Sequence, residues 1–157
     1  MLGIIPFEML QQAVFPTISR TQSKKILKNL VFLSIILGSI IGFVIYLMGD
    51  YFLIWFGGQA MLVFSSTLKF LTILCPFVAL TFVLGTCSLV AFGYNKEYNF
   101  SLIFTSIIYI IILLFLYFSD HISFWNLIYL RVFGDVLMTL IRLYFSVKRK
   151  TFVFNKN

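Results

Sequence analysis

Charged residues are scarce in this chain. Only 11% of its 157 residues are Asp, Glu, Lys or Arg, whereas 61% are hydrophobic. A water-soluble domain carries about 25% charged residues, because it needs them to cover its surface. Mean hydropathy is +1.04, and phenylalanine alone occurs 20 times. The composition therefore excludes a soluble globular domain and predicts a protein whose main solvent is lipid.

Residues that catalysis or metal binding would require are also few. The sequence contains one histidine, His121, and two cysteines, Cys75 and Cys87, which share one apolar stretch. No HExxH, CxxC or glycine-rich phosphate loop occurs, and the Asp120–His121 pair has no nucleophile or second base beside it. We therefore expect no enzyme activity, no metal site and no cofactor. A multipass acyl- or glycosyltransferase would need longer loops than these.

Five apolar stretches meet or approach the length of a membrane span. A helix needs about 20 apolar residues to cross a hydrocarbon core of about 30 Å. The stretches are residues 2–19, 29–49, 70–92, 100–118 and 122–147, and the third permits an earlier start near Gln59. The connections between them are short, so sequential helices must run antiparallel. The sequence predicts an all-α, multipass transmembrane bundle of about five helices, with residues 1–157 forming a single transmembrane domain.

Basic residues gather at one end of the predicted helices. One end holds nine of them, and the other holds only Lys69. The nine are Arg20, Lys24, Lys25, Lys28, Lys96, Lys148, Arg149, Lys150 and Lys156. The positive-inside rule then places the N-terminus outside and the C-terminus in the cytoplasm. These cations flank apolar runs and are too dispersed to form a nucleic-acid face, so we expect a lipid partner and no nucleic acid.

Polar residues inside the first stretch form one cluster of candidate site residues. Glu8, Gln11 and Gln12 have spacings of i, i+3 and i+4, which place them on one helical face. They predict a face that lines a wet cavity; the alternative is hydrogen bonding to neighbouring helices. Because such a segment follows Met1 directly, we expect further helices to precede it in a larger protein.

The last stretch carries a second cluster. Arg131, Asp135 and Arg142 stand at i, i+4 and i+11, so all three share one stripe of a helix, with Met138 between them. Arg131 and Asp135 can pair and so lower the cost of burial. Two arginines on one stripe suit an anion with spread phosphate charge. They predict a substrate cavity, although Arg142 alone could also extend to the cytoplasmic interface.

Two residues of the third stretch are hinge candidates. Pro76 removes a backbone hydrogen bond to Thr72, and Gly85 follows in the same predicted helix. A flexible kink used in conformational change and a static kink held by neighbouring helices both fit this pattern.

Three segments resemble polysaccharide flippases of the Wzx O-antigen transporter type, which belong to the multidrug/oligosaccharidyl-lipid/polysaccharide exporter superfamily. Residues 12–20 read QAVFPTISR and are similar to a stretch that closes a helix in that family. A Trp-Phe-Gly at residues 55–57 and GTCSLVAFGYNKEYN at residues 85–99 match two later patterns in the same order. The resemblance covers nearly the whole chain but only the last five helices of a family that has twelve or more.

The resemblance implies a fold and a function. The chain would form most of one lobe of a two-lobe transporter in the bacterial inner membrane. The parent protein would move undecaprenyl-pyrophosphate-linked oligosaccharide, an O-antigen or capsule repeat unit, by gradient-driven alternating access. Cavity arginines would hold the pyrophosphate. The first lobe and one further helix are missing, so we expect this fragment to be inactive alone.

Three alternatives to the flippase remain open. A drug/cation antiporter of the same superfamily would be expected to have acidic rather than basic cavity residues, because its substrates are cations. The basic stripe of the last stretch therefore favours the flippase. A membrane enzyme is disfavoured by the short loops. A non-catalytic subunit that packs against another membrane protein is compatible with the same helices.

Overall fold

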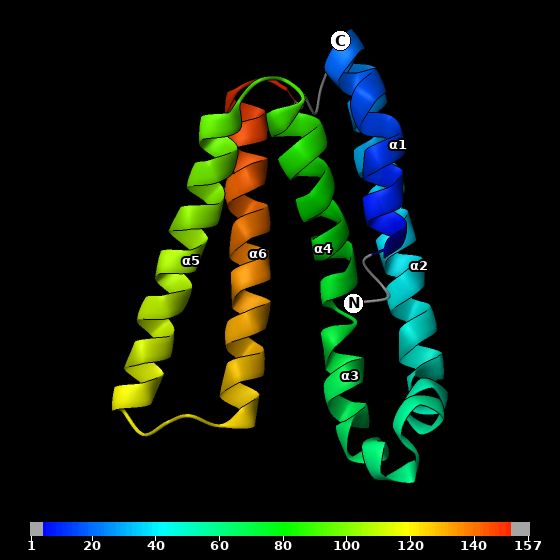
Figure 1. Ribbon diagram of the computed structural model, residues 1–157, viewed down its shortest axis with the longest axis vertical. Coiled ribbons are helices and arrows are strands. Elements are labelled where there is room, and N and C mark those ends of the chain that lie inside the picture. The colour runs from blue at the N-terminus through cyan, green and yellow to red at the C-terminus, as the bar shows by residue number, and fades with distance from the viewer. Residues whose placement is uncertain (1–4, 152–157) are drawn as a thin grey trace.

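The computed structural model describes residues 5–151, and these residues form helices joined by short connections (Figure 1). In chain order the elements are α1 (Ile5–Thr21), α2 (Lys24–Gly57), the 3-10 helix η2 (Gln59–Phe64), α3 (Ser65–Leu71), α4 (Leu74–Phe82), the π-helix η3 (Val83–Val90), α5 (Asn95–Phe118) and α6 (Phe124–Lys148). No β-strand occurs between residues 5 and 151. The predicted all-α transmembrane bundle is confirmed.

Three helices are long and apolar enough to cross a membrane: α2, α5 and α6. The bent pair Gln59–Leu71 and Leu74–Val90 makes a fourth if it is counted as one span. The helix α1 has 17 described residues, fewer than the roughly 20 that a crossing needs. Ser23 caps α2 ahead of its apolar stretch, so this helix begins at Lys24 rather than at residue 29, whereas Ser123 caps α6 within the predicted stretch 122–147.

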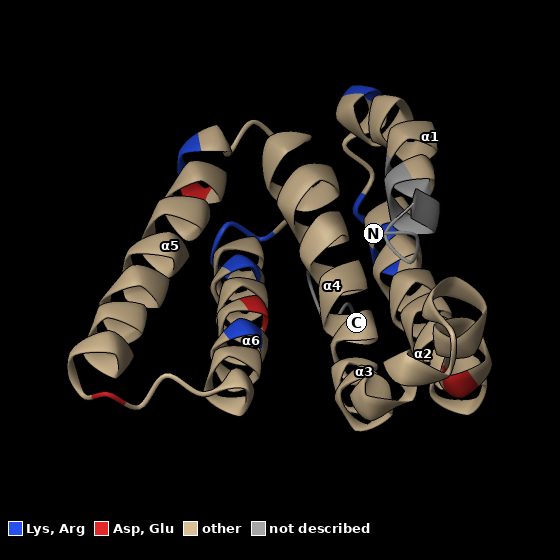
Figure 2. Ribbon diagram, turned by 60° about the horizontal axis from the view of Figure 1, so that its bottom comes forward, with Lys and Arg blue, Asp and Glu red and all other residues tan. Residues whose placement is uncertain are grey.

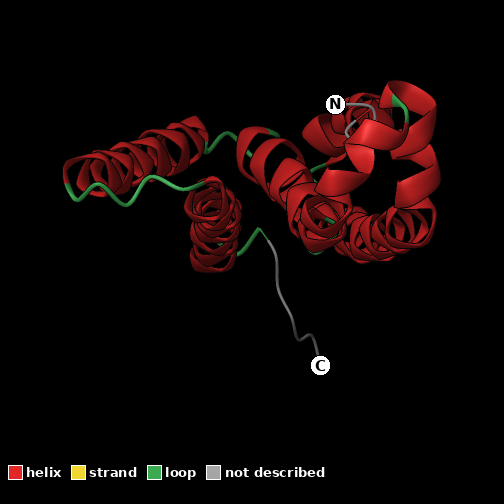
Figure 3. Cartoon of the chain, turned by 90° about the horizontal axis from the view of Figure 1, so that it is seen from below, coloured by secondary structure: helices red, strands yellow, loops and turns green. Residues whose placement is uncertain are grey.

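The helices lie side by side in the order α5, α6, α4, α2, with α1 beside α2 at one end of the molecule (Figure 1). Seen from below, α6 lies between α5 and α4 (Figure 3). A buried apolar core joins α1, α2 and η3, and its fully buried members are Ile18, Leu27, Leu84 and Cys87. Large apolar side chains cover the outer faces of α2 and α5, as expected of helices that face lipid.

Basic residues gather where α1 ends, α2 and α5 begin and α6 ends (Figure 2). Charge also lies along the length of α6, where blue and red bands alternate (Figure 2). Arg149 bonds to Glu97 at the basic end and so ties the end of α6 to the start of α5. At the opposite end, the Lys69 ammonium lies 2.8 Å from the Asp50 carboxylate and ties α3 to α2.

The third predicted span, residues 70–92, differs from the structure because helix begins at Gln59 and is broken at Thr72 and Ile73. The two parts meet at an angle of 57°. Pro76 has no N–H to donate to the Thr72 carbonyl, which instead accepts from the Cys75 N–H at 3.1 Å. Pro76 therefore lies just past the break.

Two glycines of α2 face this break. A Cβ on Gly38 would lie 2.8 Å from the Pro76 Cα, and one on Gly42 would lie 2.9 Å from the Thr72 oxygen. Both distances are shorter than van der Waals contact, so any side chain would push the helices apart. The Gly38–Gly42 pair has the GxxxG spacing that allows close backbone approach between membrane helices.

Candidate functional site

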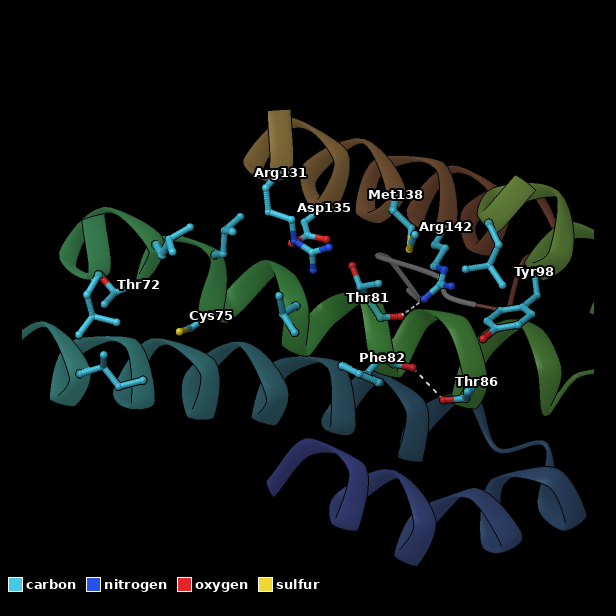
Figure 4. A pocket seen from close by; sticks show the side chains of 16 residues that line it. Thr72, Cys75, Thr81, Phe82, Thr86, Tyr98, Arg131, Asp135, Met138 and Arg142 are labelled. Carbon is cyan, nitrogen blue, oxygen red and sulfur yellow. Dashed lines mark hydrogen bonds and ion pairs between the residues drawn. The ribbon is translucent and has the colours of Figure 1, made fainter. Parts of the chain in front are cut away.

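A cavity of about 730 Å³ lies between α2, the bent third span, α5 and α6. Figure 4 shows that α6 supplies Arg131, Asp135, Met138 and Arg142 to one wall of it. The bent span supplies Thr72, Cys75, Thr81, Phe82 and Thr86, and α5 supplies Tyr98. Most of the remaining lining is aliphatic. A few polar groups in a mainly apolar hollow are typical of a small-molecule site.

Arg131 and Asp135 form an ion pair one helical turn apart. The Arg131 Nε lies 3.1 Å from Asp135 Oδ2, and the two side chains are 63% and 17% exposed. The geometry does not make a hydrogen bond: Oδ2 is buried and accepts none from the described residues. The pair is thus mainly electrostatic, and Arg131 compensates the charge of the carboxylate beside the cavity.

Arg142 is buried, with 4% of its surface exposed, although it carries a positive charge. Its Nε donates to Ser101 Oγ at 3.2 Å, and its Nη1 donates to the Thr81 carbonyl at 2.7 Å. Its Cζ lies 4.7 Å from the centre of the Tyr98 ring, within the range of a cation–π contact. These contacts connect α6 with α4 and α5, and they do not fit the alternative in which Arg142 extends to the interface.

The contacts of Arg142 leave its charge uncompensated. A hydroxyl, a backbone carbonyl and a tyrosine ring are all neutral, and no ion pair among residues 5–151 includes Arg142. Burying a charge without a counter-ion costs several kcal/mol. Arg142 also lines the cavity, so an anion in the cavity could supply the missing negative charge.

The structure brings one of the two predicted clusters together as a site. Arg131, Asp135 and Arg142 line the same cavity. In the other cluster, Gln12 is exposed on α1 and does not line the cavity, while the side chains of Glu8 and Gln11 lie outside the described residues. Of the hinge candidates, Pro76 lies beside the bend, and Gly85 lies in η3 against Arg142.

Sequence reasoning missed the residues that hold Arg142. Thr81, Tyr98 and Ser101 were not predicted as site residues, yet each contacts the guanidinium. One signal was present: Ser101 and Thr105 stand four residues apart on α5, and both are buried. Such a pair marks the face of α5 that packs against other helices rather than lipid. It does not identify Arg142 as the neighbour.

The two cysteines provide a direct test of water access to the cavity. Cys75 lines it, whereas Cys87 is fully buried in the core. We expect a charged, water-soluble methanethiosulfonate reagent to modify Cys75 about tenfold faster than Cys87 or more, because access governs the reaction. Mass spectrometry of the chain in lipid nanodiscs measures both rates, and Cys75→Ala and Cys87→Ala variants assign them. Equal rates would contradict a cavity that admits water.

The fold and the cavity define a multipass helical membrane protein with an internal polar site. No family model matches the chain, and neither a curated protein nor a solved structure matches it.

Proposed function

We propose that this chain is the C-terminal part of a polysaccharide flippase of the Wzx type. The observation that carries the proposal is Arg142, a buried guanidinium that lines a cavity and, among the described residues, contacts only neutral groups. A cavity with an unbalanced positive charge favours an anionic ligand. The resemblance of residues 12–20, 55–57 and 85–99 to the family supports the same conclusion.

The chemistry of the cavity suits a pyrophosphate group. Guanidinium groups bind phosphate oxygens through paired hydrogen bonds. Arg131 and Arg142 are eleven residues apart on one helix, which separates them by about 16 Å along its axis. Arg142 would hold the pyrophosphate of undecaprenyl-pyrophosphate-linked oligosaccharide. Arg131 would contact the ligand at a second position along the axis of α6. The polar glycan would cross through the cavity while the lipid tail stays in the bilayer.

A second lobe would complete the cavity. The Arg131 side chain is 63% exposed although it belongs to a helix that can span the membrane. Charged side chains within a membrane face water or protein rather than lipid. In the proposed transporter, helices of the other lobe would cover this face of α6. The basic end of the bundle would lie in the cytoplasm, and the membrane would be the bacterial inner membrane.

Binding of a simple anion tests the proposal. We expect the chain in nanodiscs to bind inorganic pyrophosphate and not tetraphenylphosphonium, because the uncompensated charge of the cavity is positive. Isothermal titration calorimetry measures both, and Asp135→Asn should leave pyrophosphate binding intact or tighten it. The absence of pyrophosphate binding by the wild-type chain would overturn the proposal.

One observation favours the drug/cation antiporter as a second candidate. Asp135 Oδ2 is buried and makes no hydrogen bond to the described residues, so a cation that displaced Arg131 from the ion pair could bind there. In that case tetraphenylphosphonium would bind to the wild-type chain, and Asp135→Asn would abolish the binding. If neither ion binds, the result favours the non-catalytic membrane subunit.

A further inference from the structure

The guanidinium of Arg142 occupies the space that a side chain at position 85 would need. A Cβ built on Gly85 would lie 2.6 Å from Arg142 Nη1 and 2.9 Å from Arg142 Cζ. It would also lie 3.0 Å from Cε2 of Tyr98. Real Cβ atoms essentially never approach other heavy atoms closer than 3.0 Å. Even alanine at this position would therefore displace the guanidinium or the ring.

Gly85 and Tyr98 thus enclose the guanidinium of Arg142, and they belong to two different helices. Gly85 belongs to the π-helix η3, and Tyr98 belongs to the first part of α5. The Tyr98 ring centre lies 4.7 Å from Arg142 Cζ, so the glycine leaves a gap between η3 and the ring that admits a planar group. Single-turn π segments occur often at functional sites. We name the four groups that enclose Arg142 the Arg142 socket: Gly85, Tyr98, Ser101 and the Thr81 carbonyl.

The socket also sets the orientation of the guanidinium. The Ser101 hydroxyl donates to the Tyr98 carbonyl at 2.6 Å, which leaves its lone pairs to accept from Arg142 Nε. The Thr81 carbonyl accepts from Nη1 on the other side. An arginine has five N–H donors, and the described residues engage two of them. The other three make no hydrogen bond to the described residues.

We propose that Gly85 and Ser101 are positioning residues that hold Arg142 ready to bind a phosphate-type anion. The proposal rests on the function proposed above, because it presumes that Arg142 binds the anion. Gly85 acts by having no side chain, and Ser101 acts as a fixed acceptor for Nε. This assigns Gly85 a role other than that of a hinge: it makes room for the charge that the cavity presents.

A double-mutant cycle tests the steric part without any ligand. We expect Gly85→Ala to lower the thermal midpoint of the chain in nanodiscs by about 5 °C, because the new Cβ overlaps Arg142. In an Arg142→Ala background the same change should cost about 1 °C or less, because the overlap with the guanidinium is gone and only the 3.0 Å approach to Tyr98 remains. Gly134→Ala is the control, since a Cβ there meets only Tyr109 at an ordinary 3.5 Å. Equal losses in both backgrounds would overturn the socket.

Anion affinity tests the positioning part. We expect Gly85→Ala and Ser101→Ala each to weaken inorganic pyrophosphate binding by about tenfold, the effect of losing one charge-assisted hydrogen bond. Ser101→Thr, which keeps the hydroxyl, should restore the affinity. Unchanged affinity in Ser101→Ala, or no recovery in Ser101→Thr, would contradict the role of Ser101. A parallel titration uses an isoprenyl pyrophosphate in the nanodisc. Tighter binding of this lipid than of inorganic pyrophosphate indicates a lipid-borne headgroup, and the reverse indicates the free ion.

The two proposals can fail separately. If the wild-type chain binds neither form of pyrophosphate, the proposed function and the positioning role are both contradicted. The double-mutant cycle between Gly85 and Arg142 still tests whether Gly85 makes room for the guanidinium. If pyrophosphate binds and depends on Arg142 but not on Gly85 or Ser101, only the positioning role falls.

Discussion

Replacing Arg142 with methionine is expected to weaken anion binding strongly while leaving the fold as stable as before or more so. The guanidinium is buried without a counter-ion among the described residues, and an apolar side chain of similar length removes that cost. Pyrophosphate affinity should fall by about a hundredfold, because several charge-assisted hydrogen bonds to the anion are lost together. Calorimetry gives the affinity, and a thermal melt of the same sample gives the stability.

Two arginines serve as controls for this substitution. Arg131→Met should weaken binding by about tenfold or less, because its charge is already compensated by the ion pair with Asp135. Arg20→Met, at the exposed end of α1, should have no effect on binding. A large loss of stability in Arg142→Met with unchanged affinity would mean that the guanidinium serves only to join the helices.

The double variant Gly38→Ala/Gly42→Ala is expected to destabilise the bundle strongly. Each new Cβ would lie under 3.0 Å from backbone atoms around the break, at Pro76 and at Thr72. Backbone atoms cannot rotate away as a side-chain tip can, so α2 and the bent span must separate. We expect a loss of about 3 kcal/mol, which is about 10 °C in the thermal midpoint.

The control for this pair is again Gly134→Ala. All three changes place alanine in a helix and gain the same helix propensity, which is about 1 kcal/mol over glycine. Gly134 has room for a Cβ, so that variant should melt at the same temperature as the wild type or higher. If all the variants behave alike, the close approach of α2 to the break does not limit stability.

The same two glycines bear on whether the bend is rigid. Pro76 accounts for a missing hydrogen bond, but a missing bond alone allows a range of angles. Gly38 and Gly42 bring α2 against Pro76 and Thr72 on one side of the break. On α6, the Thr139 hydroxyl shares a hydrogen bond with the Thr81 hydroxyl and lies 3.3 Å from the Phe77 carbonyl. The bend of 57° is thus supported by neighbouring helices on both sides.

The sequence by itself determined the solvent of this protein and the fold class. Runs such as residues 29–49 and 100–118 are too apolar to be surrounded by water. Their length is close to that of a helix that crosses a membrane. The spacing of Arg131, Asp135 and Arg142 is likewise enough to place them on one stripe of a helix. These inferences hold because hydropathy and helical spacing are local properties of the chain.

Only the tertiary structure decided what surrounds each charge. The sequence could not show that Arg142 would be held by Ser101 and the Thr81 carbonyl, because those contacts join residues about 40 and 60 positions away. It also left open why Gly85 is a glycine, since the reason is the guanidinium of another helix. A buried charge is stabilised or strained by its neighbours in space, and in a helical bundle those neighbours come from other helices.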